Sequence, residues 1–321
     1  MLADVITLRP VDLTADLEAL YQVALASETA VVDDPDTSRS DISGMFTSPE
    51  ADLVGGSRVA VDDTGAPLGF VAVFYDTAGR EVTADAYVHP TAGDDVWDRL
   101  LEHASAYAAA RMAALDPDDA AQWTFCAGSY AQDTRYASAL RRQDLSVVRR
   151  FHSMGVTFDP ADPPRPPAPL PGVTVTVVGE DEALLRAAHE VANTSFTEHW
   201  NHVPRPYDLF MEYVRSQDAF DPTQWWLASV DGTPAGVSLG NEHLAENGWG
   251  YVGTLGVVKE FRHRGIARLL LETAFAEAYA RGRVGVKLGV DSENSTGAPA
   301  LYTAVGMRPL QEIDFWARPI V

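Results

Sequence analysis

The segment between residues 251 and 307 constrains the fold more than any other part of the chain. Residues 251–258 form an apolar run with the length and composition of a strand that is buried on both faces. A polar, basic turn follows at residues 259–267 and leads into a helical pattern that extends to residue 281, with apolar side chains recurring at a spacing of four. The pattern predicts a strand, a tight basic turn and the N-terminus of a helix.

Such a turn is suited to binding an anion. The first amides of a helix have no intrahelical partner, and the helix dipole places partial positive charge beside them. Gly265 and the small Ala267 would let a ligand approach the backbone closely. The basic residues of the turn are Arg262, His263, Arg264 and Arg268. The alternative is an ordinary strand–helix connection whose basic side chains face solvent.

A second strand and a short helix are predicted after this helix. Residues 284–290 alternate apolar side chains with Gly285, Lys287 and Gly289, which is a period of two. A polar loop that contains Asn294 then leads to a short helix with Leu301 and Tyr302.

The fixed order of these features resembles the acetyl-CoA-binding core of the GCN5-related N-acetyltransferases, the GNAT superfamily. The matching features are Arg-x-x-Gly-x-Ala at Arg262–Ala267, a helix, a strand, Asn294, Leu301-Tyr302 and Gly306-Met307. The tandem, mycothiol-synthase-like members of the superfamily are resembled in two respects. These are the sequence of residues 290–306 and the presence of a divergent copy of the unit in the first half. The resemblance implies an α/β fold with two tandem GNAT-like domains, each a mixed, mostly antiparallel twisted sheet flanked by helices.

An internal duplication supports two domains. The turn at residues 61–69 recurs at residues 230–236 between the same two predicted strands. Between the copies, residues 159–171 hold seven prolines in thirteen positions, which excludes helix and central strand. We therefore predict an N-terminal domain over residues 1–158, a linker over 159–171 and a C-terminal domain over 172–321.

The two halves differ in their chemistry. In place of the arginines of the second turn, the first half has Asp94, Asp95 and Trp97, which would repel a pyrophosphate and obstruct the helix amides. Leu140 falls at the position of Tyr302. We expect the first domain to be degenerate, to bind no CoA, and to serve as a structural lobe or a wall on the acceptor side.

The resemblance also assigns the cofactor site. It implies that the strands at residues 251–258 and 284–290 splay apart, that free backbone of the first strand pairs with the acetyl-pantetheine arm, and that amides at the helix start hold the pyrophosphate. The predicted residues are Leu255, Gly256, Val257, Arg262, His263, Arg264, Gly265, Ile266, Ala267, Arg268 and Asn294. The co-substrate is acetyl-CoA, and no metal is expected.

Acid and base catalysis are needed for direct attack of an amine on the thioester. Tyr302 is the expected general acid, as the matching tyrosine is in the family; otherwise it is a half-buried aromatic residue on a short helix. Mycothiol synthases carry a glutamate early in the strand that here contains Tyr251, and this position is not acidic. Glu242, His243 and Glu246 could act directly or through water, or be solvated loop residues, so the base stays unassigned.

Residues 195–202 carry two histidines, a tryptophan and a carboxylate. In GNAT folds this region lines the acceptor pocket, and the group could receive a polar amine. The alternative is a helix C-terminus packed by Phe196 and Trp200 with its histidines at the surface. His199 and His202 alone do not make a metal site.

The composition limits the kinds of partner. A formal net charge of −22 disfavours nucleic acid and anionic membranes, because both need a basic surface. It is compatible with an amine acceptor, although an acidic surface also aids solubility. The lone Cys126 fits a reducing compartment, and no signal peptide or membrane span is evident, so we expect a cytoplasmic protein.

These features predict acetyl-CoA-dependent N-acetylation of a small-molecule amine by direct transfer in a ternary complex. One alternative is a catalytically silent acyl-CoA-binding or regulatory protein, for which the missing base is an argument. Another is an acetyltransferase of protein amines. The sequence leaves open the identity of the acceptor, the length of the acyl group and the oligomeric state.

Overall fold

The computed structural model describes residues 6–115, 122–197, 199–200, 202–293 and 297–320. Contacts between residues divide the chain into two compact units. The first comprises Met1–Phe151 with Glu312–Val321, and the second comprises His152–Gln311. No helix in the described part of the chain is long and apolar enough to cross a membrane.

The first unit is a mixed sheet with helices on both faces. Its elements are β1 (Thr7–Arg9), α1 (Leu13–Thr29), α2 (Arg39–Thr47), β2 (Arg58–Val61), β3 (Pro67–Asp76), β4 (Glu81–Val88), α3 (Asp94–Leu115), β5 (Thr124–Tyr130), α4 (Thr134–Arg142) and the start of β6 (Ser146–Thr157). The strands β1 to β4 pair as antiparallel neighbours, and β4 pairs with β5 in parallel.

The second unit repeats this plan. Its elements are β7 (Val173–Val177), α5 (Glu182–Ser195), α6 (Tyr207–Ser216), a 3-10 turn (Pro222–Gln224), β8 (Trp225–Val230), β9 (Thr233–Asn241), β10 (Trp249–Val257), a 3-10 turn (Lys259–Phe261), α7 (Ile266–Ala280), β11 (Gly285–Asp291), α8 (Ala298–Ala304) and the start of β12 (Arg308–Pro319). The strands β7 to β10 are antiparallel, and β10 pairs with β11 in parallel.

Two strands contribute to both units. The boundary of the first unit falls within β6, so residues 152–157 belong to the sheet of the second unit, beside β11. The last strand, β12, begins in the second unit, and its residues Ile313–Pro319 pair antiparallel with β5 in the first. These compact units divide the chain at residues 151/152 and 311/312, and not at the boundaries predicted from the sequence. The predicted boundaries stay a prediction.

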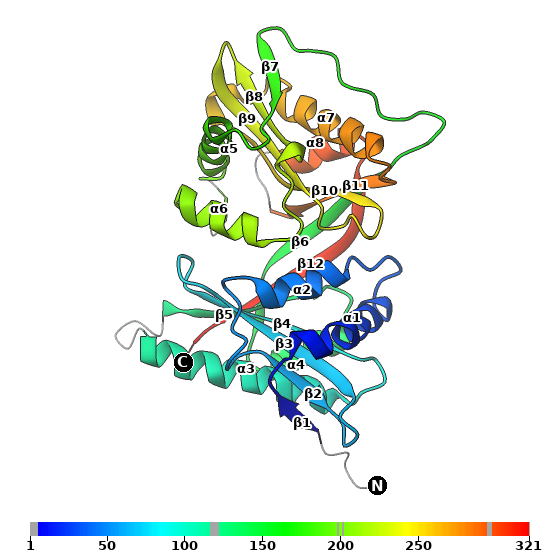
Figure 1. Cartoon of the computed structure of the whole chain (residues 1–321), viewed down its shortest axis with the longest axis vertical. Helices are drawn as coiled ribbons and strands as arrows, with labels where there is room; N and C mark the ends of the chain where they lie inside the picture. Colours follow the sequence, from blue (N-terminus) through cyan, green and yellow to red (C-terminus); the bar gives the residue numbers. More distant parts are fainter. Residues whose placement is uncertain (1–5, 116–121, 198, 201, 294–296, 321) are drawn as a thin grey trace. The chain divides into compact units, whose positions relative to one another are not determined.

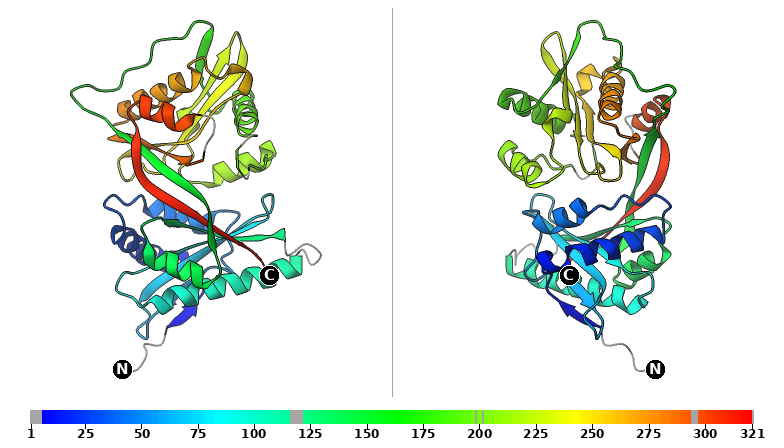
Figure 2. Two further views of the ribbon diagram at one scale, coloured as in Figure 1. Left: turned by 180° about the vertical axis from the view of Figure 1, so that it is seen from behind. Right: turned by 45° about the vertical axis from the view of Figure 1, so that its right-hand side comes forward.

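Opposite faces of the second sheet hold different helices, as Figures 1 and 2 show. A side chain at Gly256 would meet Ser195 at the end of α5, whereas one at Gly236 would meet Ile266 and Leu270 of α7. The α5 and α6 face packs on Val237 and Leu239 of β9, and the other face carries α7 and α8. This arrangement places the ends of α5, β10, α7 and α8 around one region.

Three of the described helices begin at an aspartate cap, whereas α6, α7 and α8 begin without a side-chain cap. Asp12, Asp133 and Asp181 accept backbone N–H bonds at the starts of α1, α4 and α5. The N-cap of α7 is Gly265, in the left-handed region with φ of 82°, and no described side chain caps it. The first amides of α7 are therefore left for another partner.

Candidate functional site

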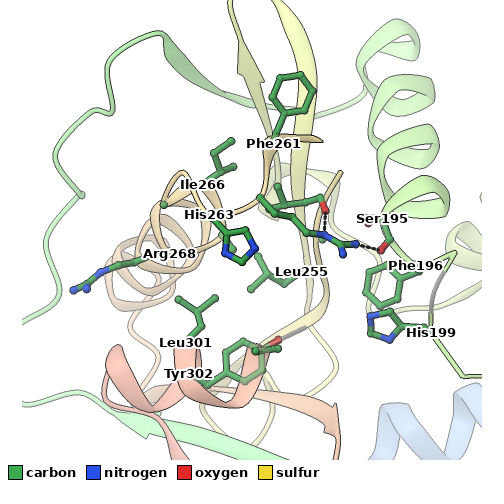
Figure 3. Close-up of a pocket in the computed structure, with 17 residues that line it drawn as sticks. Ser195, Phe196, His199, Leu255, Phe261, His263, Ile266, Arg268, Leu301 and Tyr302 are labelled. Atoms are coloured by element: carbon green, nitrogen blue, oxygen red, sulfur yellow. Dashed lines mark hydrogen bonds between the residues drawn. The ribbon is translucent and has the colours of Figure 1, made fainter. Parts of the chain in front are cut away.

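A cavity of about 260 Å³ lies within the second unit, where α5, β10, α7 and α8 meet. Figure 3 shows its lining side chains. They are Ser195, Phe196, His199, Leu255, Gly256, Val257, Phe261, Arg262, His263, Gly265, Ile266, Ala267, Arg268, Gly297, Ala298, Leu301 and Tyr302. None of these described residues is acidic, although the chain carries a formal net charge of −22. The cavity therefore favours an anionic ligand.

Two parallel strands separate at the cavity. The β10–β11 ladder contains three residue pairs and ends at Tyr251 and Lys287, so the described residues beyond it are not paired with each other in this ladder. Val258 donates its N–H to Ala235 in β9. Because backbone polar groups alternate in direction along a strand, Leu255 and Val257 direct theirs to the opposite side, toward the gap.

The turn before α7 has an unusual backbone. His263 has φ of 64° and Gly265 has φ of 82°, so both lie in the left-handed region. Gly265 adopts this conformation without a steric penalty, while His263 is held in it by the turn. In Figure 3 the His263 ring points into the cavity. The amides of Ile266, Ala267 and Arg268 belong to the uncapped first turn of α7 and lie at the cavity wall.

Arg262 connects two walls of the cavity. Its Nε donates to the Val257 carbonyl at 3.1 Å, and its Nη2 donates to the Ser195 carbonyl at 3.2 Å. These bonds tie the end of β10 to the C-terminus of α5, as the dashed lines in Figure 3 show. Arg262 therefore has a positioning role, and the Val257 carbonyl is already engaged within the protein.

The other two arginines of the turn direct their side chains elsewhere. The Arg264 guanidinium lies over the Phe261 ring, 5.5 Å from its centroid, and Arg264 does not line the cavity. Arg268 Nε is 2.8 Å from Glu272 Oε1 on the next turn of the helix, and Figure 3 shows this side chain directed away from the cavity. The backbone of the turn thus faces the cavity more than its guanidinium groups do.

Tyr302 forms part of the opposite wall. It lies on α8, is 6% exposed, and packs with the core of β10, β11 and α7. Burial raises the pKa of Tyr302 to about 12, so the phenol stays protonated at neutral pH. A protonated hydroxyl at a cavity wall can donate a proton or a hydrogen bond to a group inside it.

The third wall comes from the end of α5. Ser195 is buried against Gly256, where a Cβ would clash with Ser195 Oγ. His199 donates its backbone N–H to the Phe196 carbonyl at 2.8 Å, and the two rings are 4.3 Å apart. His199 is also one of the residues that line the cavity. Burial lowers the pKa of the neighbouring His202.

The three upstream candidates for a base lie outside the cavity lining. Glu242 accepts from Arg281 and from Arg283 and is not the solvated loop residue that the sequence suggested. His243 packs its ring against Tyr251, with centroids 5.2 Å apart. Glu246, like His243, is absent from the residues that line the cavity. Asn294, predicted to contact the cofactor, lies outside the described residues.

The first unit contains the counterpart of this site in a closed form. Its β4–β5 ladder also has three residue pairs and ends at Thr83 and Cys126. Just beyond, Tyr136 Oη donates to the Ala84 carbonyl at 3.3 Å, and the Tyr136 ring stacks on Trp97 with centroids 4.4 Å apart. The side chains of α3 and α4 thus occupy the space next to the splay.

The turn before α3 is filled as well. Arg135 donates to the carbonyls of Pro90 and Ala92 and pairs with Asp94 at 2.7 Å. Trp97 lies in the hydrophobic core and not over the first amides of α3. The predicted obstruction of these amides by Trp97 is therefore wrong. The side chain of Arg135 crosses the turn instead. The sequence had no signal for this contact, because the partners are more than 40 residues apart.

The same backbone bond follows the last helix of each unit. Met307 donates its N–H to the Tyr302 carbonyl at 3.0 Å, and Leu145 donates to the Leu140 carbonyl at 3.1 Å. This equivalence places Leu140 where the second unit has Tyr302. The first unit therefore has no phenol at that position.

Comparison with known proteins adds family information. Residues 185–307 match the model of the acetyltransferase (GNAT) family, a range that includes every residue lining the cavity. No curated protein gives a significant match.

Solved structures match the whole chain. A GCN5-related N-acetyltransferase from Sphaerobacter thermophilus is 27% identical, with a TM-score of 0.82 over 100% of this chain and 97% of that one. A tandem GNAT protein from the clavulanic acid biosynthesis pathway is 16% identical, with a TM-score of 0.72 over 99% of each chain. A GCN5-related N-acetyltransferase from Kribbella flavida is 18% identical, with a TM-score of 0.57 over 92% and 96%.

Proposed function

Because the chain belongs to the GNAT superfamily of acetyltransferases, in its tandem form, we propose that it transfers the acetyl group of acetyl-CoA to a small-molecule amine. The transfer is direct and takes place in a ternary complex. The second unit carries the reaction, and the first is a structural unit that binds no CoA.

One observation carries this proposal. A single cavity is lined by the uncapped first turn of α7, by β10 beyond the end of its ladder with β11, and by the buried Tyr302. These are an anion site, an exposed strand edge and a proton donor. An acyl thioester with a phosphate-bearing tail needs all three.

We place the ligand along these features in order. The amides from Gly265 to Arg268, which line the cavity, hold the pyrophosphate, with His263 beside it. The Leu255 backbone and the Val257 N–H pair with the pantetheine arm, and Gly256 keeps the strand close to α5. Arg262 stabilises this arrangement through Val257 and Ser195, so it contributes to cofactor binding indirectly.

The chemistry follows from Tyr302. The amine nitrogen forms a bond to the acetyl carbon while the carbon–sulfur bond breaks, and the leaving thiolate takes the Tyr302 proton. A pKa of about 12 keeps that proton on the phenol until sulfur becomes negative. The amine loses one proton, so the products are an acetamide and CoA thiol.

The acceptor is a small amine. The formal net charge of −22 raises the local concentration of cationic amines around the protein. The Phe196 and His199 rings supply a wall that can pack on an apolar part of the acceptor.

A transfer assay tests the proposal. The purified chain is incubated with acetyl-CoA and, separately, with butylamine, glucosamine, spermidine, lysine or a lysine-containing peptide, and thiol release is followed with mass analysis of the product. We expect amine-dependent thiol release and an acetylated small molecule. Acetylation of the peptide alone would contradict the acceptor class, and no transfer to any amine would contradict the enzyme.

A further inference from the structure

The cavity offers few groups that can accept a proton. Among its described lining residues, Arg262 and Arg268 carry fixed positive charges, and the pKa of Tyr302 is raised to about 12. Only His199 and His263 remain as groups of the type that titrates near neutral pH. Among the described lining residues, the candidates for a base are therefore these two histidines, acting directly or through water.

The two histidines lie at different parts of the cavity. His263 belongs to the left-handed turn before α7, next to the amides that we assign to the pyrophosphate. Protonation there would favour the anion instead of removing a proton from the acceptor. His199 lies in the segment after α5, on the far side of the cavity from Tyr302 in Figure 3.

The position of His199 is well defined. The ring packs on Phe196, and the backbone N–H of His199 is held by the Phe196 carbonyl at 2.8 Å. Phe196 is the C-cap of α5 and donates to the Ala192 carbonyl. Arg262 holds the preceding residue, Ser195, to the end of β10. This chain of contacts connects the segment of His199 to the end of β10, the strand that we assign to the thioester arm.

We propose that His199 is the general base of the acetyl transfer, an assignment that rests on the proposed function. The His199 imidazole accepts the proton that the amine nitrogen loses as it bonds to the acetyl carbon. Tyr302 gives its proton to the thiolate. The imidazolium then releases its proton to solvent, and the phenolate takes one proton from solvent. The acceptor amine therefore lies between Phe196 and Tyr302.

Charged and titratable groups around His199 come from three other places. These are the turn after β10, with Arg262 and His263; α8, with Tyr302; and a later residue of the same segment, His202, whose ring also contacts Phe196. No described carboxylate lines this cavity.

The test compares His199→Gln with the matched control His202→Gln. Both histidines contact the Phe196 ring, with centroids 4.3 Å and 6.2 Å away, and only His199 lines the cavity. Rates are measured from pH 5.5 to 9 with saturating acetyl-CoA and the best amine of the panel. We expect His199→Gln to lower kcat at least about 100-fold and to remove the decline of kcat at acidic pH. The affinity for acetyl-CoA stays within about twofold, and His202→Gln keeps the wild-type profile.

An added-base experiment gives a readout that a structural role would not affect. The His199→Ala variant is assayed with external imidazole, which we expect to restore part of kcat in a concentration-dependent way. An unchanged pH profile in His199→Gln, or equal losses in both glutamine variants, would overturn the role of His199 while leaving the enzyme intact. Failure of the wild-type chain to bind acetyl-CoA or to acetylate any amine would overturn the proposed function and this role together.

Discussion

The two units contain the same splayed pair of parallel strands, and they differ in what fills it. In the second unit the ladder ends at Tyr251 and Lys287, and the space beyond it opens into a cavity. In the first unit the ladder ends at Thr83 and Cys126, and Tyr136 donates to the first carbonyl beyond it.

This difference shows that a duplicated backbone can carry an open cavity in one unit and a filled space in the other. An aromatic stack and one arginine close the first site, while Gly265, an uncapped helix and a phenol characterise the second. The buried polar groups differ as well. Burial raises the pKa of Glu28 in the first unit to about 7.

The largest effect is expected from filling the open site. Gly265→Tyr places a ring beside the first α7 amides at a residue with φ of 82°. We expect acetyl-CoA binding to weaken more than about 1,000-fold, which corresponds to about 4 kcal/mol. The control is Gly282→Tyr, at the other end of α7, where φ is 78° and no atom lies within 4 Å. Calorimetric titration of both variants measures the effect, and equal losses would show that backbone strain alone is responsible.

Removing the phenol is expected to affect turnover more than binding. Tyr302→Phe should lower kcat about 100-fold and leave the affinity for acetyl-CoA nearly unchanged. An acid must be protonated to donate, and the pKa of Tyr302 is raised to about 12. The wild-type rate should therefore show no alkaline loss near pH 10, where an ordinary tyrosine titrates. Full activity of the variant across this range would exclude Tyr302 as the acid.

The buried acid of the first unit gives a pH-dependent stability. Because the folded pKa of Glu28 is raised from 4.5 to about 7, the folded state holds its proton more tightly than the unfolded state. Its contribution is present at low pH and is lost as pH rises through 7. Between pH 5.5 and 8.5 this decline amounts to about 2 kcal/mol.

Urea unfolding across this pH range checks the contribution of Glu28. We expect Glu28→Gln to remove most of the decline, since the amide does not titrate. Glu18 lies on the same helix and is exposed, and its pKa is lowered to about 2 by Arg39. Glu18→Gln is therefore the control and should retain the decline. The same pH dependence in wild type and Glu28→Gln would contradict the buried acid.

The smallest effect is expected from the closed site. Tyr136→Phe removes the hydrogen bond to Ala84 and keeps the ring stacked on Trp97. We expect a loss of about 1 kcal/mol of unfolding free energy and no new ligand site. Denaturant unfolding measures the first and titration with acetyl-CoA measures the second. Acquisition of a second acetyl-CoA site would mean that the Tyr136 hydroxyl alone closes the space beyond the β4–β5 ladder.

The sequence predicted the elements that depend on local pattern. The apolar run, the basic turn and the helix are present as β10, residues 258–265 and α7, and Tyr302 lies on a short helix at the cavity. The two-unit α/β fold is confirmed, because the repeated turn and strand patterns are local signals as well.

Features that depend on distant contacts could not be predicted in this way. Arg262 and Ser195 are 67 residues apart, so a residue expected at the phosphate is found bridging two walls. The sharing of β6 and β12 between the units has no local signal either, since an extended run does not show which sheet it joins. Arg281 and Arg283 likewise engage Glu242 across about 40 residues.

The stoichiometry of acetyl-CoA binding tests the central claim most directly. This claim is that the space beyond the β10–β11 ladder is open and the space beyond the β4–β5 ladder is filled. A calorimetric titration of the wild-type chain should give one site per chain, and Gly265→Tyr should abolish it. Two sites per chain would contradict the closure by Tyr136, Trp97 and Arg135, and no site would contradict the open slot in the second unit.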